Sequence, residues 1–213
     1  MPYRITEARL ERDQIQREHI LTCALQQVVE GGFAALSMNS LARGAGIATG
    51  TLYRHFAGKG ALASEVFARA TSVEVETLRS QFSGEGSAAE RLRRGISQFA
   101  ARAWHSRQLA YALIAEPVEP EVDAQRLIFR EAYAELYCDL IREGNIDGSF
   151  SVQHIPLTAA CLVGAVAEAL VGPLSPQSRA DRAEGLPSET LESLTHAIII
   201  FSLRALGAKE PVA

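Results

Sequence analysis

Apolar residues at helical spacing, interrupted by glycine and proline, are the feature that most restricts how this chain can fold. In the first such segment the apolar residues recur at i, i+3, i+4, i+7 and i+8, which places them on one helix face. They are Leu21, Ala24, Leu25, Val28 and Val29. Two glycines follow at 31–32 and predict the end of this helix. No segment shows the alternation of a strand, so the sequence predicts an all-α fold.

The same reading gives a series of helices along the chain. Breaks are predicted at Pro117, Pro120, 145–148 and Gly172–Pro173. The segment 175–187 is rich in Pro, Ser, Gly and charge, and we expect it to form a loop. The expected helices span residues 12–31, 37–46, 49–58, 59–82, 88–105, 107–115, 119–143, 155–171 and 188–206.

Size and composition indicate a soluble cytoplasmic protein. The 213 residues, 47% of them hydrophobic, are enough for one large or two small domains. Cys23, Cys138 and Cys161 are widely spaced and form no disulfide framework, which fits a reducing compartment. The most apolar stretch, 155–174, contains Pro156 and Glu168 among its residues and is not a convincing membrane span.

The formal charge of −4 is unevenly distributed. Residues 1–60 hold seven Lys or Arg and five Asp or Glu, a charge of +2, which leaves −6 for residues 61–213. A mildly basic head on an acidic body would orient the approach of a nucleic acid toward the head.

The block 32–62, GFAALSMNSLARGAGIATGTLYRHFAGKGAL, has the pattern of a helix-turn-helix. Apolar residues stand where two crossing helices pack, at Leu41, Ala45, Ile47, Leu52 and Phe56. The outward positions carry hydroxyls, a phenol and cations, which are groups that bond phosphate oxygens and base edges. These residues are Thr49, Thr51, Tyr53, Arg54, His55 and Lys59.

This block and the helix before it resemble the DNA-binding domain of the TetR family of bacterial transcriptional regulators. The likeness rests on Gly31-Gly32-Phe33, Ser37-Met38, Leu41-Ala42, Ala45-Gly46-Ile47, Gly50 to Phe56, Lys59 and Leu62, about a quarter of the chain. It implies a three-helix DNA-binding domain at 1–60 and an effector-binding and dimerisation domain at 61–213. It also implies a homodimeric regulator, expected to be a repressor, that binds palindromic operator DNA and is released by a small-molecule effector.

The resemblance assigns roles to individual positions. Thr49, Gly50 and Thr51 would begin the recognition helix, and Tyr53, His55 and Lys59 would contact phosphates. Asn39 and Arg43 could reach bases or backbone, and Arg54 is a further candidate. The chain departs from the family at Gly60, where many relatives carry an acid that complements the helix dipole.

Aromatic residues concentrate in the three helices expected after residue 88. They are candidates for the wall of a largely apolar effector pocket, although a packed core gives the same pattern. The candidates are Phe99, Trp104, His105, Tyr111, Phe129, Tyr133 and Tyr137. The acids Glu116, Glu119, Glu121 and Asp123 would either favour a cationic ligand or form a solvated helix start.

The last two expected helices are too apolar for simple surface helices. We expect them to pair with the same helices of a second copy around a twofold axis; completing the protomer's own core is the alternative. The candidate interface residues are Leu162, Val166, Leu170, Leu191, Leu194, Ile198 and Phe201.

Enzyme functions find no support in the sequence. The five histidines form no H-x-x-x-H or E-x-x-H pattern, and we expect no metal, no cofactor and no catalytic residue. The stretch Gly84-x-Gly86-x-x-Ala89 follows a helix and not a strand, which is unlike a dinucleotide fingerprint. A helical small-molecule-binding protein with little or no DNA affinity, or a helical scaffold for a protein partner, remains as the alternative function.

Overall fold

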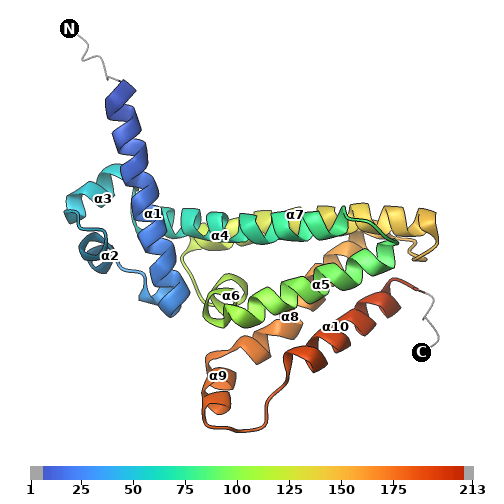
Figure 1. The fold of residues 1–213 in the computed structure, drawn as a ribbon. Helices are drawn as coiled ribbons and strands as arrows, with labels where there is room; N and C mark the ends of the chain where they lie inside the picture. Colours follow the sequence, from blue (N-terminus) through green and yellow to red (C-terminus); the bar gives the residue numbers. More distant parts are fainter. Residues whose placement is uncertain (1–6, 209–213) are drawn as a thin grey trace.

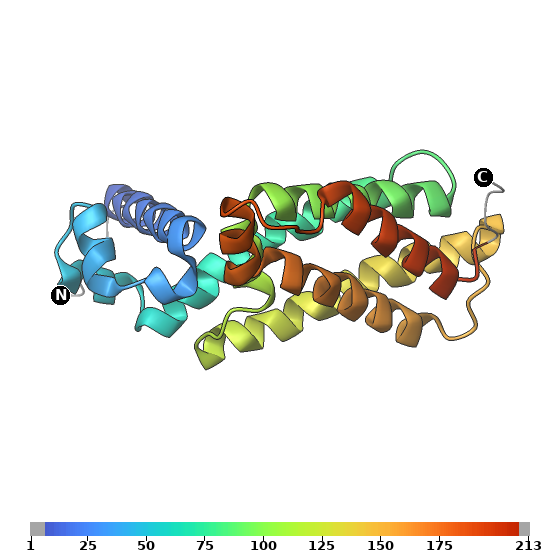
Figure 2. The same cartoon turned by 90° about the horizontal axis from the view of Figure 1, so that it is seen from below.

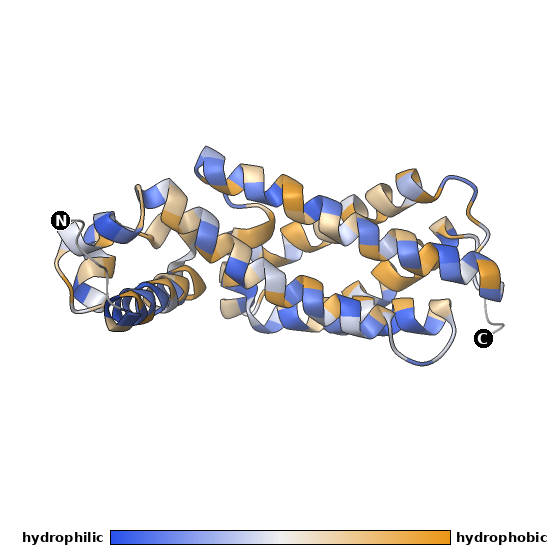
Figure 3. Cartoon of the chain, turned by 90° about the horizontal axis from the view of Figure 1, so that it is seen from above, coloured by the Kyte–Doolittle hydropathy of each residue, from blue (hydrophilic) through white to orange (hydrophobic). Residues whose placement is uncertain are grey.

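A computed structural model describes residues 7–208, and this part of the chain is all helical, as predicted. Helices α1 (Glu7–Ala35), α2 (Met38–Gly44) and α3 (Thr49–His55) form the small group at one end of the molecule (Figure 1). The Ser37 hydroxyl accepts a hydrogen bond from the Ser40 N–H at 3.2 Å and so caps α2. The outer half of α1 is hydrophilic and exposed (Figure 3).

The remaining helices form an elongated bundle. Helices α4 and α7 run side by side along one face, and α5, α8 and α10 lie across from them (Figures 1 and 2). The short α6 packs on α1 and therefore belongs to the contact between the bundle and the first three helices. The bounds are α4 (Lys59–Phe82), α5 (Ala88–His105), α6 (Arg107–Ile114), α7 (Pro120–Asp147), α8 (Ile155–Leu174), α9 (Pro176–Ala183) and α10 (Leu191–Ala205).

Two hydrophobic cores hold this arrangement together. One lies inside the bundle, between α4, α5, α7, α8 and α10. The other is centred on α1–α3, but it also takes in Leu62 to Phe67 from α4, Ala112 from α6 and Val122 from α7. Because α4, α6 and α7 contribute to the first-domain core, no cut at residue 60 separates the two groups of packed side chains.

The structure corrects several of the expected boundaries. Helix α1 begins at Glu7 and not at residue 12, and it continues to Ala35 across the non-helical Gly32. Residues 176–183 form helix α9 inside the expected loop, since Ser175 caps the helix and Pro176 suits its first position. Helix α8 includes Pro173 in its last turn and ends one residue later, at Leu174, because proline lacks the N–H that would continue the helical hydrogen bonds. Helix α7 extends to Asp147, whose carboxylate accepts the Ser149 and Ala88 N–H groups at 2.7 and 2.9 Å.

Helix α8 meets the length and composition of a membrane-spanning helix. A single helix of this kind is weak evidence for a membrane protein. Its inner face carries Ala159, Leu162, Val166 and Leu170, which are buried in the bundle core.

Candidate nucleic-acid interface and ligand cavity

Helix α3 separates an apolar face from a polar one. Leu52 and the following Phe56 are buried in the first core, and they fix how the helix lies on α1 and α2. Tyr53 is 55% exposed on the opposite side and forms no hydrogen bond within residues 7–208. Gly50 is also exposed, while Thr49 and Thr51 are half-buried at the start of the helix. Asn39 and Arg43 on α2 are exposed, and their side chains form no hydrogen bond or ion pair within the described chain.

Two of the predicted DNA contacts are engaged with α1. The Arg54 guanidinium lies 3.5 Å from the Asp13 carboxylate, and His55 Nε2 lies 3.1 Å from the Gln16 amide oxygen. Both groups stand at the C-terminal end of α3, next to the exposed half of α1. They therefore link the recognition helix to α1, and a nucleic acid would have to compete for them.

Lys59 is held by the second domain. Its Nζ lies 2.8 Å from a carboxylate oxygen of Glu119, the residue that precedes α7. Burial of the Glu119 carboxylate opposes ionisation, but the hydrogen bond and charge of Lys59 outweigh it, and the pKa of Glu119 is lowered. The acidic stretch before α7 thus supplies a counter-charge inside this protein at a position predicted to meet phosphate.

Glu116 makes a second and more buried contact with the first three helices. Its two carboxylate oxygens accept the Phe33 and Ala34 backbone N–H groups, each at 2.9 Å. The backbone of Gly32 is non-helical there, with φ 74°, and a Cβ on Gly32 would collide with the Glu116 carboxylate. Glycine is therefore required at position 32 both for its backbone angle and for the space beside it.

Gly60, in the first turn of α4, lies beside the exposed side chain of Glu121 on α7. A Cβ on Gly60 would lie within 2.6 Å of the Glu121 carboxyl carbon. An acidic side chain on α4 at this point would also meet a like charge.

The bundle encloses a cavity of about 560 Å³ between α4, α5, α6, α7 and α8. Apolar side chains make most of its wall, including Phe67, Leu78, Phe99, Phe129 and Val166. This size and lining are typical of a site for a small, largely apolar molecule.

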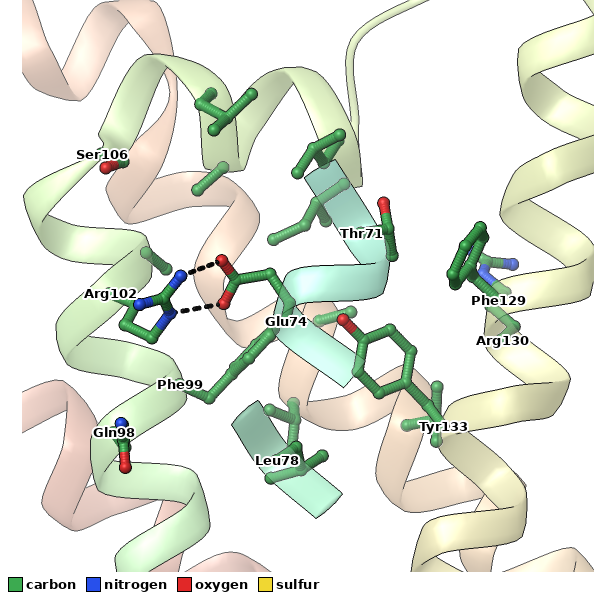
Figure 4. Close-up of a pocket in the computed structure, with 18 of the residues that line it drawn as sticks. Thr71, Glu74, Leu78, Gln98, Phe99, Arg102, Ser106, Phe129, Arg130 and Tyr133 are labelled. Atoms are coloured by element: carbon green, nitrogen blue, oxygen red, sulfur yellow. Dashed lines mark hydrogen bonds and ion pairs between the residues drawn. The ribbon is translucent and has the colours of Figure 1, made fainter. Parts of the chain in front are cut away.

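A few polar groups lie on the cavity wall (Figure 4). Arg102 donates two hydrogen bonds to the Glu74 carboxylate, at 2.6 and 2.8 Å. The Tyr133 hydroxyl lies on the same side, and burial and then the Glu74 charge raise its pKa, so it is a hydrogen-bond donor at neutral pH. The Thr71 hydroxyl is buried and has no hydrogen-bond partner. These groups are available to orient a ligand in an otherwise apolar space.

Five of the seven predicted pocket residues line the cavity: Phe99, His105, Phe129, Tyr133 and Tyr137. Trp104 and Tyr111 lie outside its wall; the Trp104 ring is covered by two guanidinium groups. The sequence reading missed the contributions of α4 and α8. Phe67, Thr71, Glu74 and Leu78 recur at helical spacing on α4, and two polar residues within that stripe are the signal that could have revealed them.

The predicted interface residues lie mostly inside the protomer. Leu162, Val166, Leu170, Leu194 and Ile198 are buried in the bundle core. Leu191 is half-buried, and Phe201 is 54% exposed. The outer face of α8 instead presents Leu157, Ala160, Cys161 and Gly164, and the outer face of α10 presents His196, Ala197 and Phe201.

No group of three or more His, Cys, Asp or Glu side chains in the described part of the chain is placed to hold a metal ion.

A profile of the family described as bacterial regulatory proteins, tetR family, matches residues 20–66. No curated protein matches the sequence. Among solved structures, FadR from Bacillus halodurans, a fatty acid degradation regulator, is similar with a TM-score of 0.73 and 20% identity, over 91% of this chain and 97% of that one. The transcriptional regulator FadR from Bacillus subtilis, in complex with stearoyl-CoA, gives a TM-score of 0.71 and 18% identity, over 88% and 98%.

NemR from E. coli in its reduced form is a third similar structure, with a TM-score of 0.71 and 18% identity over 92% and 100% of the two chains. These likenesses extend the agreement from the helix-turn-helix to the whole fold. Residues 20–66 thus match the tetR-family model, and the described chain has the fold of solved structures described as TetR-family transcriptional regulators.

Proposed function

We propose that this protein is a cytoplasmic one-component repressor that binds palindromic operator DNA as a homodimer and releases it when a small molecule fills the cavity. One observation carries the coupling between the two sites. Arg126 lines the cavity and donates hydrogen bonds to the carbonyl oxygens of Glu116, Ala112 and Leu113. Glu116 in turn holds the end of α1. A cavity residue and the helix-turn-helix domain are therefore one side chain apart.

The outward residues of α2 and α3 are the proposed DNA-contacting surface. Tyr53, Gly50, Asn39 and Arg43 are exposed on it and free of competing protein contacts within residues 7–208. Thr49 and Thr51 lie in the first turn of α3, where the positive dipole end favours a phosphate; the Thr51 N–H donates to the Ala48 carbonyl at 2.9 Å. Arg54, His55 and Lys59 would join the interface by exchanging their protein partners for phosphates.

The outer faces of α8 and α10 are the proposed dimer surface. Leu157 is 58% exposed and Phe201 is 54% exposed, and the small residues Ala160 and Gly164 would allow the α8 helices of two copies to approach closely. A pair of helices from each copy would form a four-helix interface. The operator would then be read at two half-sites about 34 Å apart or a close multiple of that distance.

Release follows from linkage. An effector that binds more tightly to one domain arrangement than to the other shifts the dimer toward the preferred arrangement by its difference in binding free energy. Helix α4 joins the two domains and Arg126 joins the cavity to α1, so both are placed to carry the change.

The effector is proposed to be largely apolar with one polar end. The apolar wall fits such a molecule, and the Thr71 and Tyr133 hydroxyls and the Arg102–Glu74 pair lie together on it. The structural similarity to a FadR bound to stearoyl-CoA makes stearoyl-CoA the first compound to try.

Selection of bound duplexes from a random DNA pool tests the proposal directly. We expect a palindromic consensus, a dimer in light scattering, and loss of the complex when a cavity ligand is added. If no duplex is retained even at low salt, the DNA-binding proposal is wrong.

One observation favours the alternative function, a helical ligand-binding protein with little DNA affinity. The three cationic or ionisable groups expected at phosphates, Arg54, His55 and Lys59, all have partners within the protein. Ligand binding in the cavity together with the absence of salt-dependent DNA retention would support that alternative.

A further inference from the structure

Three arginines gather on the outside of the bundle, away from the cavity. Arg107 is the first residue of α6, and Arg179 and Arg182 lie on α9. The Arg107 guanidinium carbon lies 4.2 Å from the centre of the Trp104 ring, and that of Arg182 lies 4.6 Å from the same ring. Figure 2 shows α9 at the end of the bundle that faces the first three helices. None of the three arginines lines the cavity.

The cluster forms no ion pair within residues 7–208. No carboxylate forms an ion pair with any of the three arginines; Asp181, their neighbour on α9, accepts a hydrogen bond from Gln177. Arg182 donates to the Pro173 carbonyl and the Ser188 hydroxyl, at 3.0 and 3.2 Å, and Arg179 donates to the Gln108 amide oxygen. All these acceptors are uncharged.

Each guanidinium also keeps one buried nitrogen without a partner. These atoms are Arg107 Nε, Arg179 Nε and one Nη of Arg182. A buried donor that lacks an acceptor destabilises a fold, and a charged one does so more strongly. Arg107 makes no hydrogen bond through its side chain at all within the described chain.

The electrostatics of Arg107 also indicate positive charge that the protein does not neutralise. Burial first, and then the charges of Arg182 and Arg179, lower its pKa. A guanidinium nevertheless stays protonated at neutral pH, so the repulsion remains until an anion binds. The first turn of α6 begins at Arg107 without a side-chain cap from Ser106, which adds a positive dipole end at this place.

We propose that Arg107, Arg179 and Arg182 form a binding site for the phosphate group of a small molecule. Three guanidinium groups match a multiply charged oxyanion better than a carboxylate with a single charge. A phosphate also offers several oxygens to the Arg107 Nη groups, which have no hydrogen-bond partner within residues 7–208 and, unlike Nε, are not buried. The site is distinct from the cavity, so the inference does not depend on the proposed DNA binding or on its effector.

Isothermal titration of the full-length protein with inorganic pyrophosphate tests the site. At low ionic strength we expect saturable binding of pyrophosphate and at least about tenfold weaker binding of acetate, because one charge-assisted contact corresponds to about a tenfold change in affinity. Absence of pyrophosphate binding at millimolar concentrations would overturn the proposal. Equal affinity for acetate would overturn the assignment to phosphate.

Arg107→Gln removes one cation from the cluster, and Arg142→Gln is the matched control on the exposed surface of α7, where Arg142 pairs with Asp139. We expect Arg107→Gln to weaken pyrophosphate binding about tenfold or more and Arg142→Gln to leave it unchanged. Arg107→Lys keeps the charge but loses the planar guanidinium, which can donate two parallel hydrogen bonds, and should give an intermediate affinity. Wild-type affinity in Arg107→Gln would contradict the assignment.

Thermal unfolding without anion separates a ligand site from a structural role. Arg107→Gln relieves repulsion and should leave the midpoint unchanged or raise it, whereas a structural arginine would lower it. If Arg107→Gln does not fold, that outcome contradicts the proposal, and Arg179→Gln provides an independent binding test. If duplex DNA competes with pyrophosphate at the cluster, the phosphate belongs to nucleic acid and the small-molecule assignment is wrong.

Discussion

The α2–α3 surface and the cavity are built in opposite ways. The surface comes from one continuous stretch of chain, in which buried Leu52 and exposed Tyr53 are neighbours and helix periodicity alone decides which faces outward. The cavity takes its wall from five helices that are up to about a hundred residues apart in sequence. A short motif can therefore specify the first region, while the second depends on how the whole bundle packs. Substitutions in the bundle can therefore change the cavity while the helix-turn-helix sequence stays the same.

The largest expected effect is a difference in stability loss when a buried leucine is shortened in each of the two regions. Leu52→Ala should cost about 2–5 kcal/mol, because Leu52 is fully buried in a small core. Leu78→Ala should cost less, since Leu78 lies on the wall of an existing cavity and has fewer side-chain neighbours to lose. Urea unfolding of both variants measures the difference. An equal loss would mean that the two cores are equally well packed.

A smaller effect is expected where the two regions meet. Glu116→Ala leaves the Phe33 and Ala34 N–H groups without their acceptor and should cost about 1–3 kcal/mol. Glu131→Ala on the exposed part of α7 is the matched control and should be close to neutral. Urea titration measures the free energy of unfolding of both variants. If Glu116→Ala leaves the free energy of unfolding unchanged, the Glu116 carboxylate does not stabilise the contact between the domains.

The next comparison concerns Lys59 and its partner. Lys59→Ala should weaken DNA binding about tenfold and lower the salt slope by about one counterion per protomer. Glu119→Gln should have the opposite effect, because it releases Lys59 from its ion pair.

Glu121→Gln is the matched control for Glu119→Gln, since Glu121 contacts Gly60 and not Lys59. Fluorescence anisotropy at several salt concentrations measures both the DNA affinity and its dependence on salt. Weaker binding by Glu119→Gln would show that the ion pair assists DNA binding and does not compete with it.

The smallest effect is expected from a single hydroxyl on α3. Tyr53→Phe should cost about 0.5–1.5 kcal/mol of binding free energy, equally on cognate and altered operators, if the hydroxyl meets a phosphate. Thr51→Ala should change sequence preference instead. Binding to a panel of single-base operator variants distinguishes these outcomes, and a changed preference in Tyr53→Phe would assign its hydroxyl to a base.

The sequence predicted the fold well where local signals decide. The cap at Ser37 and the breaks at Gly58 and Ser83 to Ser87 placed α2, α3, α4 and α5 at or close to their observed bounds. Helix α9 was missed because a polar composition was given more weight than the Ser175-Pro176 start signal.

Long-range contacts could not be predicted in the same way. Nothing near Lys59 in sequence indicates Glu119, and nothing near Gly32 indicates Glu116, since these pairs meet only when α6 and α7 pack against the first domain. The unpaired arginines were missed for the same reason, because Arg107 and Arg182 are brought to one indole ring only by the packing of α9.

The fit of Glu116 against Gly32 restricts how this protein can be recombined. A chimera that joined the helix-turn-helix of another regulator to this bundle would bring any side chain at position 32 into the Glu116 carboxylate. The residues between α6 and α7 would therefore have to be exchanged together with the DNA-reading domain. For the engineering of sensors the unit of exchange is therefore residues 1–67 together with 112–122, because the first core also takes in residues of α4, α6 and α7.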